Sequence, residues 1–133
     1  MPKAGGIAVL TEGVKLPFSK KTAVRYAERI LSIVRYKKSG VCILFVNDTR
    51  IKKLNKKYRD RDKSTDVLAF ETGDIAISAE MAEKNSRRFG STAAEELKLY
   101  MIHGILHLSG YDDTSSSKRK EMRMMEGKIL RRL

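Results

Sequence analysis

Two histidines, His103 and His107, are the only imidazole groups in the sequence, and they stand four residues apart in an apolar stretch. On a helix this spacing places both side chains on one face, about one turn apart, where they can bind the same metal ion. Gly110 follows three residues later, where a helix commonly ends in a left-handed residue and the chain can turn back. Asp113 then stands six residues after His107. We therefore predict a metal site made by His103, His107 and Asp113.

Two imidazoles and one carboxylate are a donor set typical of catalytic zinc, because a fourth position stays open for water. The spacing is also that of the metzincin metal site, with an aspartate as third ligand. Gly104 stands where those proteases carry the glutamate that acts as general base, which argues against peptide hydrolysis. Two alternatives remain: Asp112 could supply the oxygen, although its spacing fits less well, or the histidines could be core residues without a metal.

The composition indicates a partner with negative charge. The chain has 133 residues, 41% of them apolar, which fits one domain with a hydrophobic core. Lysine and arginine number 28 against 16 acids, giving a net charge of +12 and predicting a polyanionic partner, most commonly nucleic acid. No segment has the length of a transmembrane helix, and residues 1–6 lack a signal peptide's apolar core. We expect a cytoplasmic protein with no membrane partner.

The positive charge is concentrated in two segments. Residues 50–63 contain eight basic and two acidic side chains, and residues 118–132 contain seven basic and two acidic ones. Most of these charges are expected to form a solvated face. Arg59 is the best functional candidate, because it stands at the end of an expected helix beside a polar loop, where a guanidinium can make bidentate contacts to phosphate. The predicted nucleic-acid-binding residues are Lys56, Lys57, Arg59, Arg61 and Lys63.

Hydrophobic periodicity predicts the elements that position these residues. Strands are expected at 7–10, 41–46, 67–70 and 74–78, and the six consecutive apolar residues of 41–46 indicate a strand covered on both faces. A first helix begins at Ser19 and ends near Gly40. A second is capped at Asn47–Asp48 and has the apolar stripe Ile51, Leu54 and Tyr58. A third, residues 79–89, is closed by Gly90.

The helix that carries the histidines is expected to be the central one. Thr92 and Glu95 form a capping box at its start, and between residues 97 and 108 the only charged side chain is Lys98. A final helix begins within 114–117. The short connection 71–73 makes its two strands antiparallel, whereas strands joined through helices can be parallel. We predict one α+β domain over residues 1–133, with about four strands in a mixed sheet, about five helices, and a metzincin-like metal helix.

The sequence around the histidines resembles the YbeY endoribonuclease family, the bacterial rRNA maturation factors. The family motif is His-Gly-x-Leu-His-Leu-x-Gly-Tyr-Asp-His, and the chain reads His-Gly-Ile-Leu-His-Leu-Ser-Gly-Tyr-Asp from His103, departing only at Asp113. A second block is also similar, and the resemblance covers about residues 41–125. That block comprises Phe45–Asp48, Leu54-Asn55, Tyr58-Arg59, Asp62, Thr65–Phe70 and Gly73–Ile75.

The resemblance implies a metal-dependent, single-strand-specific endoribonuclease that acts in rRNA maturation and ribosome quality control. It implies that His103 and His107 are ligands of one divalent ion, expected to be zinc, and that Arg59 serves RNA binding or catalysis. The implied partners are single-stranded rRNA and the ribosome or ribosomal proteins. Asp113 replaces the family histidine with a harder ligand that adds negative charge, which makes manganese or another ion easier to accommodate.

The expected mechanism is hydrolysis by a metal-activated water, with the ion polarising a phosphoryl oxygen and Arg59 stabilising the charge that develops on the phosphorane. The general acid or base is left open among Asp66, Tyr111 and Asp112, and attack by the RNA 2′-hydroxyl is an alternative. One rival function is a non-catalytic RNA- or ribosome-binding factor with a structural metal. A second, a metallohydrolase for small or peptide substrates, is disfavoured by Gly104 and by the charge.

Overall fold

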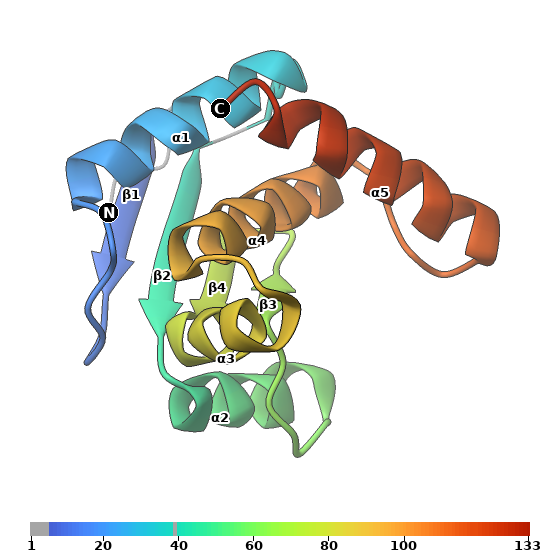
Figure 1. Cartoon of the computed structure of the whole chain (residues 1–133). Coiled ribbons are helices and arrows are strands. Elements are labelled where there is room, and N and C mark those ends of the chain that lie inside the picture. The colour runs from blue at the N-terminus through green and yellow to red at the C-terminus, as the bar shows by residue number, and fades with distance from the viewer. Residues whose placement is uncertain (1–5, 39) are drawn as a thin grey trace.

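The computed structural model describes residues 6–38 and 40–133. Four strands and five helices follow one another along this part of the chain (Figure 1). In order they are β1 (Ile7–Thr11), α1 (Lys20–Ile33), β2 (Val41–Val46), α2 (Asp48–Arg59), β3 (Val67–Ala69), β4 (Asp74–Ser78), α3 (Ala79–Phe89), α4 (Ala93–Leu108) and α5 (Ser116–Leu130).

The four strands form one mixed sheet in the order β1-β2-β4-β3. Strands β1, β2 and β4 are parallel, and β3 pairs antiparallel with β4 through the tight turn at residues 70–73. Ile43 of β2 is in register with Val9 of β1 and with Ile75 of β4. The prediction of a mixed sheet is confirmed, because the helical crossovers give parallel neighbours and the short turn gives an antiparallel one.

Different helices cover the two faces of the sheet. Along β2, Ile43 and Phe45 pack with α1 and α4 in the larger hydrophobic cluster, whereas Val46 packs with Ile51 of α2 in a smaller one. This alternation follows from the two-residue period of a strand. Five of the six residues of β2 are buried, as predicted for a strand covered on both faces.

Helix α4 lies across the sheet near the centre of the molecule (Figure 1) and contacts α1, α3, α5, β3 and β4. Eight of its residues are buried, which accounts for its nearly uninterrupted apolar sequence. Both hydrogen bonds of the predicted capping box are present: Glu95 N–H donates to Thr92 Oγ1, and Thr92 N–H donates to the Glu95 carboxylate. The buried element that carries the histidines is thus fixed at its start by local capping.

The end predicted for the first helix is wrong. Helix α1 ends at Ile33 and not near Gly40, because Arg35 adopts a left-handed conformation at φ 55°. The N–H groups of Arg35 and Tyr36 donate to the carbonyls of Ser32 and Leu31, which is the bonding of a Schellman motif without a glycine. Tyr36 then packs against the larger hydrophobic cluster, so a tertiary contact holds this turn.

Candidate metal centre

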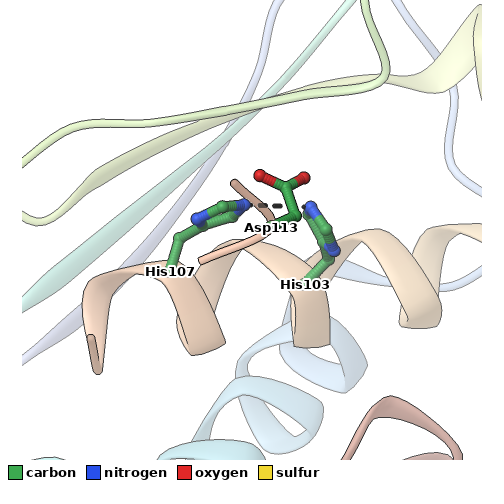
Figure 2. Close-up of side chains that lie close together, drawn as sticks. All are labelled: His103, His107 and Asp113. Carbon is green, nitrogen blue, oxygen red and sulfur yellow. Dashed lines mark hydrogen bonds between the residues drawn. The ribbon is translucent and has the colours of Figure 1, made fainter. Parts of the chain in front are cut away.

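The two histidines project from one face of α4 (Figure 2). Their ring centroids are 4.6 Å apart and the rings are nearly perpendicular, at 78°. The two Nε2 atoms face each other across 3.1 Å. Both side chains are partly buried, while the residues around them on α4 are mostly buried. The four-residue spacing therefore brings the imidazoles together on a rigid element, as the sequence predicts.

A turn after α4 brings Asp113 back to the histidines. Gly110 has φ +101°, a conformation that favours glycine, and the N–H of Tyr111 donates to the carbonyl of Leu106. Figure 2 shows the Asp113 carboxylate beside the two rings. One ligand atom from each of His103, His107 and Asp113 lies within 4.8 Å of the others. The structure thus gathers the three residues that the spacing singles out.

The donor atoms fit one divalent ion. Two nitrogens bound to a tetrahedral zinc at about 2.0–2.1 Å are about 3.3 Å apart, close to the 3.1 Å observed between the two Nε2 atoms. Two imidazoles and one carboxylate leave a fourth position for a non-protein ligand, as in catalytic zinc sites. These residues could also hold manganese, because a carboxylate oxygen is a hard donor.

The neighbouring Asp112 has other partners. Its Oδ1 accepts from the N–H of Thr114 at 3.1 Å and from its hydroxyl at 2.8 Å, and its Oδ2 accepts from Lys118 at 3.4 Å. The Thr114 bonds, followed by the Lys118 ammonium, lower the pKa of this carboxyl. Asp112 therefore stabilises the turn, and the geometry favours Asp113 over Asp112 as the third ligand.

Glu126 of α5 is a part of the site that the sequence analysis missed. Its Oε2 lies 2.5 Å from His103 Nδ1, and its side chain is only 13% exposed. A carboxylate on Nδ1 fixes an imidazole with Nε2 directed at the metal position. The sequence carried a signal only for its inward position, because Glu126 stands four residues after Met122 and three before Ile129, the two buried residues of α5.

The two histidines have opposite pKa shifts. Burial by itself lowers the pKa of His103, but the hydrogen bond to Glu126 and the charges of Glu126, Asp66 and Asp113 outweigh it, and the pKa is raised. Burial, followed by the neighbouring His103, lowers the pKa of His107. Three carboxylates, Glu126, Asp66 and Asp113, thus act on His103, and their negative charge favours a bound cation.

Gly104 has no room for a side chain. A Cβ atom built on it would lie 2.7 Å from Ile75 Cγ2 and 3.3 Å from Val67 Cγ1. The residue after the first histidine therefore faces the sheet. A glutamate at this position cannot be accommodated unless α4 moves away from β3 and β4. Gly104 stands where the metzincin proteases carry their general base. This packing gives a structural reason why the chain has no glutamate there.

A groove of about 900 Å³ connects this cluster with the basic segment after α2. His107 and Asp113 line it together with Arg59 and Phe70. Further positive side chains in its lining are Lys38, Arg61 and Lys63. The groove therefore has candidate metal ligands and several cations in one continuous concave surface, a shape and charge suited to an extended polyanion.

Arg59 is fixed in this groove by two contacts. Its Nη2 donates to the carbonyl of Ala69 at 2.6 Å, and its guanidinium lies 5.1 Å from the ring centroid of Phe70. Of the other predicted nucleic-acid-binding residues, Arg61 and Lys63 also line the groove. Lys56 and Lys57 are exposed on α2 outside the lining, and Lys56 pairs with Asp60 at 3.1 Å. Three of the five predicted nucleic-acid-binding residues thus line the same groove as the candidate metal ligands His107 and Asp113.

Two further residues that the analysis did not single out hold the groove in place. Asn55 is buried, and its amide donates to the carbonyl of Lys63 at 2.9 Å, which ties the basic loop to α2. Lys38 donates to the carbonyl of Leu108 at 2.9 Å, at the end of α4. The two contacts span eight and 70 residues of sequence, which is further than a helix-cap or turn pattern reaches, so local patterns carried no signal for them.

The three candidates for acid or base do not line the groove. Asp66 accepts from the N–H of Val67 at 2.8 Å, Asp112 is held in its turn, and Tyr111 packs against the larger hydrophobic cluster. The carboxylates in the groove lining are Glu71 and Asp113. None of the three candidates is thus in the groove lining, although the charges of Asp66 and Asp112 act on His103 and His107.

Comparison with known proteins identifies the family. The family model "Endoribonuclease YbeY" matches residues 11–133. The chain belongs to the YbeY endoribonuclease family. An endoribonuclease YbeY of Aquifex aeolicus is 34% identical, over 94% of this chain and 91% of that protein. One from Bacteroides fragilis is 33% identical, over 93% and 95%. A solution structure of a Thermotoga maritima protein matches with a TM-score of 0.64 and 33% identity, over 93% of this chain and 86% of that one.

Family membership confirms the resemblance seen in the sequence, and the fold is the predicted one. The structure places Asp113, the residue at which the motif departs from the family pattern given by the resemblance, with His103 and His107. No helix in the described part of the chain is long and apolar enough to cross a membrane.

Proposed function

We propose that this YbeY family member is a metal-dependent endoribonuclease that cleaves single-stranded RNA. The observation that carries the proposal is the meeting of His103, His107 and Asp113 at a groove lined by Arg59 and other cations. The relatives named endoribonuclease YbeY support the reaction class. The net charge of +12 supports a polyanionic substrate.

The roles of the residues follow from their positions. His103, His107 and Asp113 would hold one divalent ion, with zinc the first expectation. A bound ion supplies Lewis acidity, lowering the pKa of a water molecule and polarising a phosphoryl oxygen. Arg59 is held by Ala69 and Phe70, so its guanidinium is preorganised to stabilise charge on the phosphate under attack. Glu126 keeps the His103 ring oriented.

The biological substrate that we propose is ribosomal RNA, in its maturation and quality control, with the ribosome or ribosomal proteins as partners. Family membership and the basic groove support this proposal. A protein that acts on ribosomal RNA in a bacterium works in the cytoplasm.

The proposal is tested by metal removal and add-back. Purified chain treated with a chelator is expected to lose cleavage of single-stranded RNA, and one equivalent of zinc or manganese is expected to restore it. A duplex of the same sequence should stay intact. His107→Ala should remain folded, as judged by circular dichroism, and should not be reactivated by either ion. RNA binding without cleavage under every metal condition would instead favour a non-catalytic binding factor.

A further inference from the structure

Tyr58 is an exposed aromatic residue next to the groove. The apolar stripe of the sequence predicts it to face inward, yet 53% of it is exposed. Its ring packs edge-on against Phe70, with centroids 5.4 Å apart and an interplanar angle of 69°. Phe70 belongs to the smaller hydrophobic cluster and is partly buried. Phe70, which is partly buried, thus holds the exposed ring of Tyr58 in place.

Cations lie on both rings of this pair. Lys57 Nζ is 5.1 Å from the Tyr58 centroid, and the Arg59 guanidinium is 5.1 Å from the Phe70 centroid. Arg59 and Phe70 both line the groove that reaches His107 and Asp113. The pair therefore links the exposed ring of Tyr58 to the wall of the groove that contains the candidate metal ligands.

This combination fits an unpaired nucleotide. Single-stranded RNA presents free base faces and phosphates together, and proteins bind such strands with aromatic platforms beside positive charges. In a duplex the base faces are covered by their neighbours.

We propose that Tyr58, supported by Phe70, is a stacking site for one nucleobase of the RNA strand that lies in the groove. The phosphates next to that base would face Lys57 and Arg59. Because every base has a flat π face, this site selects single strands over duplexes without selecting a sequence. The inference rests on the proposed function, since it takes single-stranded RNA as the ligand.

The chain offers a direct optical test. It contains no tryptophan, so Tyr58→Trp introduces a single reporter at the site. Its emission is expected to be quenched when a short oligouridylate is mixed in stopped flow, before cleavage. A ribose-phosphate oligomer of equal length without bases should not quench it. Phe89→Trp is the matched control: Phe89 is 65% exposed with the Arg88 guanidinium 5.4 Å from its ring centroid, but it stands at the end of α3, and Phe70, the groove-lining ring that holds Tyr58, does not pack against it.

Affinity gives the second readout. Tyr58→Ala is expected to weaken oligouridylate binding by about tenfold or more, the effect of losing one stacked base, while binding of the base-free oligomer stays as in the unsubstituted chain. Tyr58→Phe should retain the affinity, because stacking needs the ring and not the hydroxyl. Phe89→Ala should bind both oligomers as the unsubstituted chain does.

Equal quenching of the Tyr58→Trp and Phe89→Trp reporters, or unchanged oligouridylate affinity of Tyr58→Ala, would overturn the stacking site. The proposed function is judged separately, by cleavage. A chain that cleaves RNA while Tyr58→Ala binds normally keeps the function and loses the stacking site. A chain that shows base-dependent quenching but never cleaves keeps the stacking site and loses the nuclease activity.

Discussion

The contact between His103 Nδ1 and Glu126 determines which nitrogen of that ring can reach a metal ion. With Nδ1 directed at the buried carboxylate, Nε2 is left facing His107 and Asp113. The ring of His103 therefore does not need to reorient to bind an ion, and its rotational freedom is already lost in the folded protein. A ligand that is oriented in advance binds more tightly than one that must be ordered on binding.

Replacing Glu126 should therefore weaken metal binding without removing a ligand. Glu126→Gln keeps the shape of the side chain but removes its charge, and zinc affinity is expected to fall by about 10- to 100-fold. Competition with a chromophoric chelator measures the change. Glu121→Gln is the control, because Glu121 is exposed on the same helix. Equal zinc affinity in the two variants would show that Glu126 has no part in the site.

At the scale of elements, the position of α4 depends on a close approach to the sheet. Ile75 and Val67 occupy the space where a side chain at Gly104 would lie. We expect Gly104→Ala to lower the free energy of unfolding by about 1–3 kcal/mol, the usual cost of overpacking a core. Urea denaturation measures it.

The chain contains a matched control for this substitution. Gly127 is also inside a helix, but a Cβ there would meet only the Arg131 side chain, at 3.5 Å. Gly127→Ala is expected to stabilise the protein by about 0.5–1 kcal/mol, because alanine is the better helix former. Destabilisation by Gly127→Ala similar to that by Gly104→Ala would mean that the cost is not caused by contact with the sheet.

A second link between elements depends on pH. Asp48 at the start of α2 accepts hydrogen bonds from Ser78 Oγ and Lys84 Nζ, each at 2.6 Å. Burial raises the pKa of Asp48, but these two bonds and the Lys84 charge outweigh it and lower the pKa. A carboxyl with a lowered pKa stabilises the fold above its ordinary pKa, near 4, and this contribution is lost as pH falls through the folded value.

Asp48→Asn should accordingly reduce the free energy of unfolding at neutral pH by about 1–3 kcal/mol. The difference from the unsubstituted chain should shrink as pH falls from about 4 towards the lowered pKa of the Asp48 carboxyl in the folded protein. Denaturation at a series of pH values measures both effects. Asp60→Asn serves as control, because Asp60 is 91% exposed in its pair with Lys56. A difference that is constant with pH would contradict the assignment to the Asp48 carboxylate.

The elements, and the meeting of the candidate ligand side chains, were predictable where the signal is local. The capping box at Thr92, the spacing of His103 and His107, and the turn at Gly110 are each encoded within a few residues, and the structure contains all three features. Contacts between distant segments were not predictable in this way. Glu126 reaches His103 from another helix, and the exposure of Tyr58 depends on where Phe70 lies.

At the scale of the whole molecule, the two basic segments lie in different places. Helix α2 and the loop after it are at one end of the molecule, and α5 is at the other side of α4 (Figure 1). Arg59, Arg61 and Lys63 share the groove with the candidate metal ligands, whereas Lys120 and Arg123 are exposed on α5. Similar numbers of basic side chains in the two segments therefore do not imply similar roles in binding RNA.

The salt dependence of RNA binding is expected to distinguish the roles of the two basic segments. The logarithm of RNA affinity should fall linearly with the logarithm of salt concentration, and Lys63→Ala should reduce the slope by about 0.7, the value for one phosphate contact on a single strand. Lys120→Ala on α5 should leave the slope unchanged. Fluorescence anisotropy with a labelled single strand measures both. The reverse result would place the RNA on α5 and outside the groove.

The most direct test of the account is the metal content of the purified chain and of Asp113→Ala and Asp112→Ala, together with cleavage of single-stranded RNA by each. We expect one divalent ion per chain in the unsubstituted protein and in Asp112→Ala, with cleavage by both. Asp113→Ala should lose the ion and the cleavage together. Stoichiometric metal and full cleavage in Asp113→Ala, or loss of both in Asp112→Ala alone, would contradict the assignment of His103, His107 and Asp113 as the catalytic metal site.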